Sequence, residues 1–307
     1  MAKYITKRLL FLIPVLIGVS LIVFTLLYIT PGDPARMILG EQAEQQQVDQ
    51  LREEMGLNDS FIVQYGRYVK NIVLHGDFGT SYATKSQVIE EIMAVFPNTL
   101  KLALTSVALA IVIGITFGVV SAVKQYSIFD SAISVIAILG ISMPMFWLGL
   151  LMILLFSVKL GWLPASGYDS WKHMLMPAVC LGAQSIAVIT RMTRSSMLEI
   201  VRQDYIRTVR AKGQKEMVVI VKHAFRNALV PIVTTVGLQF GNLLGGAMLT
   251  ETVFSIPGLG RLMVESIKTR DFPMVQGSVL FIAVAFTLVN LIVDLLYAYV
   301  DPRISKS

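Results

Sequence analysis

The stretch SMLEIVRQDYIRTVRAKGQKEMVVIVKHAFRNALVP, residues 196–231, lies between two long apolar runs and sets the organisation of the chain. From Arg191 to Arg226 the sequence holds nine Lys or Arg residues and three acids, a net charge of +6 that equals the formal charge of the whole chain. Short loops rich in Lys and Arg beside membrane spans stay on the cytoplasmic side. The stretch is therefore predicted to be a cytoplasmic loop between two spans.

The composition agrees with a membrane protein. Of 307 residues, 55% are apolar and 15% are charged, and the mean hydropathy is +0.68. A soluble domain carries about a quarter charged residues. The basic residues flank apolar runs, so membrane topology explains the positive charge and no nucleic-acid partner is expected. The one cysteine, Cys180, excludes an internal disulfide and a CxxC metal site, and its apolar neighbours indicate a packing role.

Six apolar runs come close to the roughly 20 residues that a helix needs to cross a bilayer. They cover about residues 9–30, 99–123, 132–158, 174–190, 229–250 and 275–300. The first run is too long for a signal-peptide core, and no small-x-small cleavage site follows it. We therefore expect an all-α membrane protein with six transmembrane helices and both termini in the cytoplasm.

Residues 31–98 form the longest polar region. They hold ten acids and five Lys or Arg residues, a net charge of −5 opposite in sign to the central loop, so they are expected outside. Helices are predicted over 41–55 and 61–74. The second is too short and polar to span, and it should lie on the membrane or pack on the spans. The predicted regions are residues 1–30 with the first span, this outer helical insertion at 31–98, and a core of five spans at 95–300.

Two apolar runs carry features that interrupt or tighten a helix. Met143, Pro144 and Met145 break the third run, where a proline needs neighbouring helices or water to satisfy the freed carbonyl. The break is either a packed kink or a hinge or wall of a pathway. The fifth run carries glycines that allow close helix contact, namely Gly237, Gly241, Gly245 and Gly246.

The central loop itself predicts two helices. Residues 204–212 contain no Gly or Pro, and Gly213 follows as a plausible C-cap. Residues 215–225 offer a second helix with an apolar face of Val218, Val221 and Phe225. Asn227 is expected to cap the fifth span, with Pro231 in its first turn. The apolar face requires a partner surface, which is either another protein or a membrane of anionic lipid.

Several motifs resemble one family of bacterial ABC importer permeases. YIRTVRAKG (205–213) and HAFRNALVP (223–231) are similar to the cytoplasmic "EAA" loop of the dipeptide/oligopeptide/nickel permeases. Further similarities run from end to end: RLLFLIPVLIGVSLIVF (8–24), TPGDPA (30–35), GDFGTS (76–81), GWLPASGY (161–168) and ETVFSIPGLGRL (251–262). The N-terminal pattern and the large outer loop resemble the first of two paired permeases. Arg207, Thr208 and Val209 stand where the general motif has Glu-Ala-Ala, so its acidic residue cannot be carried over.

The resemblance implies a type I ABC importer fold and a translocation subunit that is not an enzyme. It implies a second homologous permease, two cytoplasmic ATPases that bind ATP and Mg, and an extracytoplasmic substrate-binding protein, all in the bacterial inner membrane or at its surfaces. No cofactor is expected on this chain, which lacks a GxxxxGK[ST] run. The implied cargo is dipeptides or oligopeptides, with nickel chelates or glutathione as alternatives.

The resemblance also implies a coupling loop at residues 191–228. We expect its apolar positions to fill a groove on the ATPase, its cations to pair with an acidic rim, and Gly213 to allow the sharp turn. The residues expected to couple to the ATPase are Asp204, Tyr205, Arg207, Thr208, Arg210, Ala211, Lys212 and Gly213.

Two other classes of protein have six spans. A rhomboid-like protease needs a nucleophile with a base inside the membrane, and none of the three histidines, His75, His173 and His223, lies in a predicted span. An ion-coupled transporter would use intramembrane charges, for which Lys101, Glu251 and Asp294 are candidates. Asp294 lies deepest, and we expect it to be satisfied within the bundle or by a partner rather than to couple ions.

Overall fold

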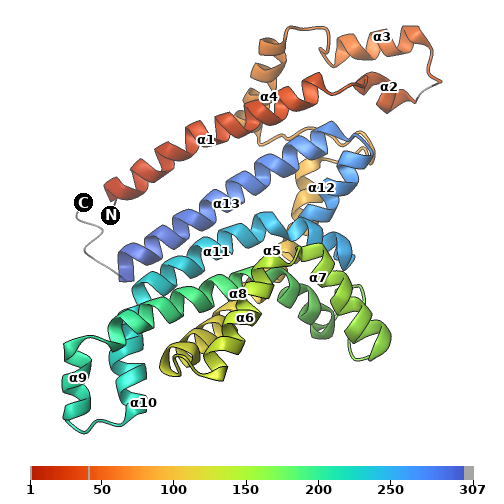
Figure 1. Cartoon of the computed structure of the whole chain (residues 1–307). Helices are drawn as coiled ribbons and strands as arrows, with labels where there is room; N and C mark the ends of the chain where they lie inside the picture. Colours follow the sequence, from red (N-terminus) through yellow and green to blue (C-terminus); the bar gives the residue numbers. More distant parts are fainter. Residues whose placement is uncertain (1, 41, 301–307) are drawn as a thin grey trace. The chain divides into compact units, whose positions relative to one another are not determined.

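A computed structural model describes residues 2–40 and 42–300, with side chains described from residue 10 to residue 293 except at 11 and 41. These residues form helices joined by turns (Figure 1), and the β pairing among them is an isolated bridge between Thr80 and Gln87. They group into two compact units, residues 98–257 with 286–300, and residues 2–97 with 258–285.

In the first unit the long helices α5 (Val88–Val123), α8 (Trp171–Val201) and α11 (Arg226–Val253) supply most of the core. Their central cluster consists of Leu102, Ala103, Val107, Met174, Met176, Ala178, Cys180, Leu181, Leu243, Leu244, Ala247, Phe254 and Ile256. Cys180 is buried in it and donates to the Met145 carbonyl oxygen at 3.2 Å, which confirms the predicted packing role.

Two glycines let α5 and α8 cross closely. A Cβ atom added to Gly114 would lie 2.8 Å from Ile189 Cγ2, and one added to Gly118 would lie 2.4 Å from Thr193 Cβ and 2.7 Å from the Thr190 carbonyl oxygen. Small residues four apart on a membrane helix permit this close contact of backbones. Neither glycine was singled out from the sequence.

Of the four glycines of α11 predicted to allow close helix contact, two do so. A Cβ atom at Gly237 would lie 2.1 Å from Val293 Cγ1 of α13 (Phe272–Val300), and one at Gly241 would lie 3.1 Å from Asn290 Oδ1. Gly245 has open space around it, and a Cβ at Gly246 would meet Leu181 at an ordinary 3.8 Å. Only the first two glycines therefore mark a tight helix crossing within the unit.

The third apolar run does not form one kinked helix. It divides into α6 (Ile128–Ser142) and a second arm, α7 (Met145–Met152) followed by the π-helical η1 (Ile153–Lys159), and the two arms are bent by 111°. Each arm has 15 residues and is about 22 Å long, too short to cross a bilayer alone. The break at Met143 and Pro144 is therefore a sharp turn rather than a packed kink. With this pair as one broken span the described residues contain six spans, and five without it.

The helices beside the central loop are longer than predicted. Helix α8 continues 11 residues past the expected end at Thr190, and α10 (Glu216–Val218), η2 (Val219–Phe225) and α11 join into one continuous helix from Glu216 to Val253. The expectation that Asn227 caps a new helix is wrong, and Pro231 lies inside the helix rather than in its first turn. Packing of Val219, Ala224 and Ala228 in a common cluster outweighs these local start signals.

In the second unit the outer insertion packs on the first span. Its helices are α2 (Pro34–Leu39), α3 (Gln45–Glu54) and α4 (Phe61–His75), and the span is α1 (Ala2–Ile29). The ring of Phe24 lies edge-on to Phe61 and Tyr65, each at 5.4 Å, and Ser20 Oγ lies 2.9 Å from Tyr65 Oη. The predicted helix at 61–74 is confirmed, with its aromatic face against α1. Helix α2 and the later α12 (Leu259–Lys268) were not predicted.

A buried carboxylate fixes the turn before α5 in this unit. Asp271 accepts hydrogen bonds from Ser81 Oγ, from the Tyr82 backbone N–H at 3.1 Å and from the Ala83 N–H at 3.3 Å. Burial and the Asp271 charge raise the pKa of Tyr82 to about 12. The turn that contains Ser81, Tyr82 and Ala83 is thus tied to the start of α13.

Replacing Gly118 with alanine tests the close crossing. The new methyl group would collide with a backbone carbonyl as well as a side chain, and we expect Gly118→Ala to lower the free energy of unfolding by about 1–3 kcal/mol. The control is Gly18→Ala in α1, where nothing lies within 4 Å of the added Cβ. Thermal unfolding of the detergent-solubilised protein measures both. Equal unfolding temperatures for the two variants would contradict the crossing.

Candidate functional site

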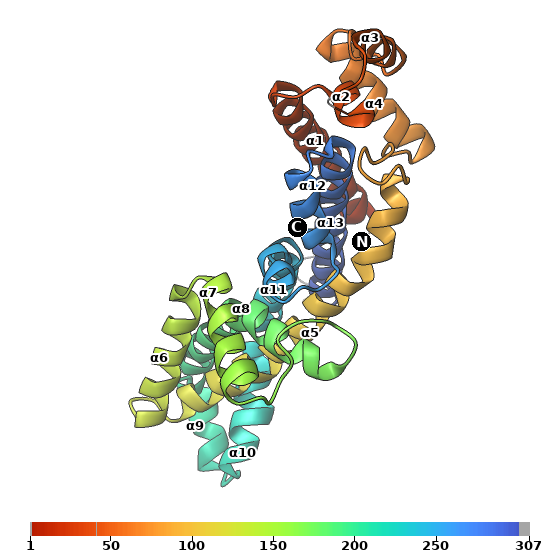
Figure 2. The ribbon, with the colours of Figure 1, turned by 90° about the vertical axis from the view of Figure 1, so that its right-hand side faces the viewer.

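Residues 204–225 form a helical hairpin, which we call the α9–α10 hairpin. Helix α9 (Asp204–Ala211) runs beside α10 and η2 at the end of α8 and α11 (Figures 1 and 2). Gly213 has φ +74°, a conformation that favours glycine, and its N–H donates to the Arg210 carbonyl oxygen at 2.9 Å. The predicted helix–Gly–helix is confirmed, with Gly213 as the residue that lets α9 end and the chain turn.

Some apolar side chains of the hairpin face inward, while Met217 and Val221 are exposed. Ile206 is fully buried, and its cluster joins the hairpin to the ends of α5, α8 and α11 through Ala122, Met197, Val219, Ala224, Ala228 and Ile232. The expectation that the loop's apolar positions fill a groove on another protein is therefore wrong for Ile206 and Val219. These buried side chains fix the hairpin to three long helices of its own chain, whereas they had been expected to contact a partner protein.

The predicted apolar face of the second helix is also displaced. Val221 is 54% exposed, while Val219 and Ala224 are buried. The reason is that η2 is π-helical, with a wider turn than the α-helix on which the spacing of Val218, Val221 and Phe225 was based.

Polar and charged residues make up most of what the hairpin exposes, beside the apolar Met217 and Val221. All eight predicted coupling residues are exposed, with Arg207 81% and Asp204 98% exposed at the side chain. Arg210 pairs with Glu216 at 2.7 Å, so the two arms are tied across the turn and the pKa of Arg210 is raised. Asn227 Nδ2 donates to Tyr205 Oη at 2.9 Å, which holds that ring against the second arm. The eight residues thus lie on one exposed, structured tip.

A buried ion pair fastens the turn between α5 and α6 to α8. Arg194 donates from Nε to Asp130 Oδ1 and from Nη2 to Asp130 Oδ2, each at 2.8 Å, and Nε also reaches Ser121 Oγ at 3.0 Å. Asp130 further accepts from the Tyr126 backbone N–H at 3.0 Å. Its side chain is 7% exposed and that of Arg194 29%. From the sequence Arg194 was predicted only to add to the charge of the loop, although Asp130, a lone acid at the start of an apolar run, was a signal for a buried partner.

Carboxamides lie in the middle of α8 and α11. Gln184 and Asn242 are exposed on the chain by itself, and Ser185 donates to Gln239 Oε1 at 3.0 Å. These residues line a hollow of about 190 Å³, and Met145 lines both it and a neighbouring hollow of about 180 Å³. Met143 lines the second hollow. The Met143–Met145 break was a predicted pathway candidate. The carboxamides were not predicted, since in the sequence they stand out only as uncharged polar residues in apolar runs.

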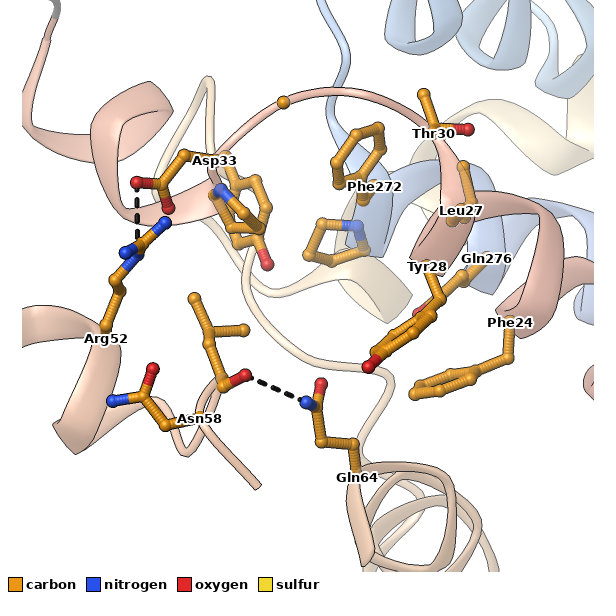
Figure 3. A pocket seen from close by; sticks show the side chains of 15 residues that line it. Phe24, Leu27, Tyr28, Thr30, Asp33, Arg52, Asn58, Gln64, Phe272 and Gln276 are labelled. Atoms are coloured by element: carbon orange, nitrogen blue, oxygen red, sulfur yellow. Dashed lines mark hydrogen bonds and ion pairs between the residues drawn. The ribbon is translucent and has the colours of Figure 1, made fainter. Parts of the chain in front are cut away.

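The second unit has its own hollow of about 360 Å³ (Figure 3). Aromatic rings from α1 and α13 line it, including Phe24, Tyr28 and Phe272. Asp33 pairs with Arg52 at 3.1 Å and also caps α2 by accepting from the Ala35 N–H at 3.1 Å. These charges hold the outer insertion together, since each has a partner within it.

The three charged residues considered for ion coupling differ in their surroundings. Lys101 Nζ lies 5.6 Å from the centre of the Tyr168 ring. Glu251 is fully buried and accepts from Thr99 Oγ1 at 2.6 Å, a structural role at the end of α11. Asp294 belongs to α13, but its side chain is outside the part of the chain that is described.

Comparison with known proteins covers the whole chain. The family model for the binding-protein-dependent transport system inner membrane component matches residues 114–306, and the model for the N-terminal part of such membrane components matches residues 1–103. The dipeptide transport system permease protein DppB of Alkalihalophilus pseudofirmus is 48% identical, and the glutathione transport system permease protein GsiC of Escherichia coli (strain K12) is 46% identical. Each alignment covers 99% of both chains.

Solved structures share the fold. A chain of the inward-facing MetNI methionine ABC transporter has a TM-score of 0.56 at 21% identity, over 69% of this chain and 97% of that one. An amino acid ABC transporter has a TM-score of 0.52 at 16% identity, over 70% of this chain and 94% of the other. The expected importer fold is confirmed for the part of the chain that these structures cover.

Removing the Asp130 carboxylate tests the buried pair. Asp130→Ala leaves Arg194 without its partner, and we expect a loss of about 2–3 kcal/mol of stability because Arg194 is partly able to reach water. The matched control is Glu265→Ala, which removes an exposed pair with Arg261 and should cost under about 1 kcal/mol. The double variant Asp130→Ala/Arg194→Leu should recover part of the loss. Thermal unfolding measures all three, and no recovery would show that the unpaired charge is not the cause.

Proposed function

The chain belongs to the family of inner-membrane components of binding-protein-dependent transport systems, and on that premise we propose that it carries short peptides inward as one of two membrane subunits of an ATP-driven importer. It is a multi-pass permease, and two family models match it over residues 1–103 and 114–306. The observation that carries the proposal is the α9–α10 hairpin, a structured charged tip fixed to three long helices.

We propose that the exposed tip of this hairpin receives a cytoplasmic ATPase. The tip offers Arg207 and Lys212 for pairing with acids on that partner, and such pairs orient a complex more than they tighten it. Because the hairpin's apolar side is buried against α5, α8 and α11, a push on the tip would move these helices together. The Asp130–Arg194 pair would pass the same movement to α6 and so to the bent third span.

If the hairpin receives the ATPase, the positions of the other subunits follow. The hairpin and both termini would lie in the cytoplasm, and the outer insertion at residues 31–98 would meet an extracytoplasmic substrate-binding protein. The core at 95–300 would face a second, homologous permease. ATP and Mg would be bound by two ATPase subunits, and this chain would hold neither.

The proposed cargo follows from the named relatives. One is a dipeptide permease and the other a glutathione permease, and both cargoes are short peptides with at least one amide bond. Cells that lack other peptide importers and express the complete system should take up a labelled dipeptide, and uptake should stop when the ATPase is inactivated. Uptake that continues without ATP hydrolysis but follows a proton gradient would instead support an ion-coupled transporter.

Substitution at Gly213 tests the hairpin's role. Gly213→Val forces a β-branched residue to φ +74°, so the turn must rearrange although nothing lies within 4 Å of the added Cβ. We expect the complex to assemble and reach the membrane, with uptake reduced at least tenfold relative to ATP hydrolysis. The control is Gly213→Asn, since Asn tolerates this conformation. Normal uptake by the valine variant would refute coupling through this turn.

A further inference from the structure

We propose that Gln184, Gln239 and Asn242 form an uncharged hydrogen-bonding site that holds the peptide bonds of the cargo as it passes through the membrane. The inference rests on the proposed function and adds to it the residues and the part of the cargo that they recognise. It is carried by the depth of these residues, their exposure and the absence of charge around them.

Gln184 and Asn242 lie several turns inside helices that are long and apolar enough to cross a membrane. Gln184 is 13 residues from the start of α8, and Asn242 is 11 residues from the end of α11. At 1.5 Å per residue these are distances of about 17–20 Å along the helices. A polar side chain at that depth does not face lipid tails, because nothing there can accept or donate a hydrogen bond. The exposed Gln184 and Asn242 must therefore face a water-filled path or another protein.

Their hydrogen-bonding capacity is free for a ligand. Within residues 2–40 and 42–300, neither Gln184 nor Asn242 has a side-chain hydrogen-bond partner. Ser185 donates to Gln239 Oε1 at 3.0 Å, which orients that carboxamide and leaves its amide nitrogen to donate. A carboxamide offers both donors and an acceptor, the same groups that a peptide bond presents.

The surroundings suit a passing molecule of this kind. Gln184 and Met145 belong to both hollows, of about 190 and 180 Å³, so the carboxamides border a concave surface rather than a flat one. No Asp, Glu, Lys, Arg or His lines either hollow in the described part of the chain. Leu181 and Val188 complete the first hollow with apolar surface.

An uncharged site binds cargo less tightly than a charged one, which helps the cargo to leave. Hydrogen bonds to charged groups are about twice as strong as those between neutral groups. A conducting path must bind its cargo well enough to admit it and weakly enough to release it. Neutral carboxamides meet both needs and treat acidic, basic and neutral peptides alike, since every peptide has a backbone amide and only some have charged side chains.

The experiment replaces each exposed carboxamide with leucine in the complete transporter. For Gln184→Leu and Asn242→Leu we expect uptake of Ala-Ala, Lys-Ala and Glu-Ala to fall about tenfold and by similar factors, while the subunits co-purify in normal amounts. Gln184→Asn, which keeps the carboxamide, should retain most uptake. Gln184→Glu should favour uptake of Lys-Ala over Glu-Ala, and Gln184→Lys should favour uptake of Glu-Ala over Lys-Ala.

The outcomes decide between distinct explanations. Loss of the second permease from the leucine variants would overturn the proposal and assign these carboxamides to the contact between subunits. Unchanged uptake by the leucine variants, or equal effects of the Glu and Lys substitutions on the three peptides, would also overturn it. If the unaltered transporter fails to take up any peptide, the proposed function fails instead, and the two failures are thereby distinguishable.

Discussion

Lipid tails offer no hydrogen bonds, and each unsatisfied backbone group in them costs several kcal/mol. This constraint accounts for the helices that fill the described chain, and it decides which departures from a straight helix require support. The sharp break before α7 lies against the core, where Cys180 donates to the Met145 carbonyl oxygen in the first turn of α7. At the α5–α6 turn, Asp130 receives hydrogen bonds from Arg194 Nε and Nη2 and from the Tyr126 backbone N–H. Gln184 and Asn242, which have no hydrogen-bond partner among the described side chains, lie in the middle of α8 and α11.

The same constraint makes the sequence informative about spans and uninformative about their ends. Six runs of apolar residues were sufficient to predict six spans, because length and hydropathy are nearly all that a bilayer requires. The runs say little about where a helix stops once it leaves the membrane. Helix α8 goes on to Val201 and α11 is continuous from Glu216, because their extensions bury Met197, Val219 and Ala224 together. Asn227 and Pro231 carry ordinary start signals, and tertiary packing overrides them.

For the hairpin too, some features could be predicted from the sequence and others could not. Its two helices and the turn at Gly213 followed from local sequence, since only glycine adopts the required backbone conformation at little cost. Which side faces the membrane helices did not follow, because η2 is π-helical and changes the spacing of its side chains. The Asp130–Arg194 pair was missed for a related reason: the two residues are 64 positions apart, and charge counting treats each only as a marker of topology. The role of the eight exposed residues stays a prediction.

The hairpin end of α8 and α11 and the middle of the same helices differ in how strongly their side chains interact. At the hairpin, dense apolar packing and ion pairs join several helices, so that a displacement at the tip is not absorbed locally. In their middle, the same two helices present neutral carboxamides and open space at Gly245, and neutral groups form weaker hydrogen bonds than charged ones. The proposed function requires this contrast. Strong interactions within the chain would transmit motion from the ATPase, and weak interactions with the cargo would let it pass on.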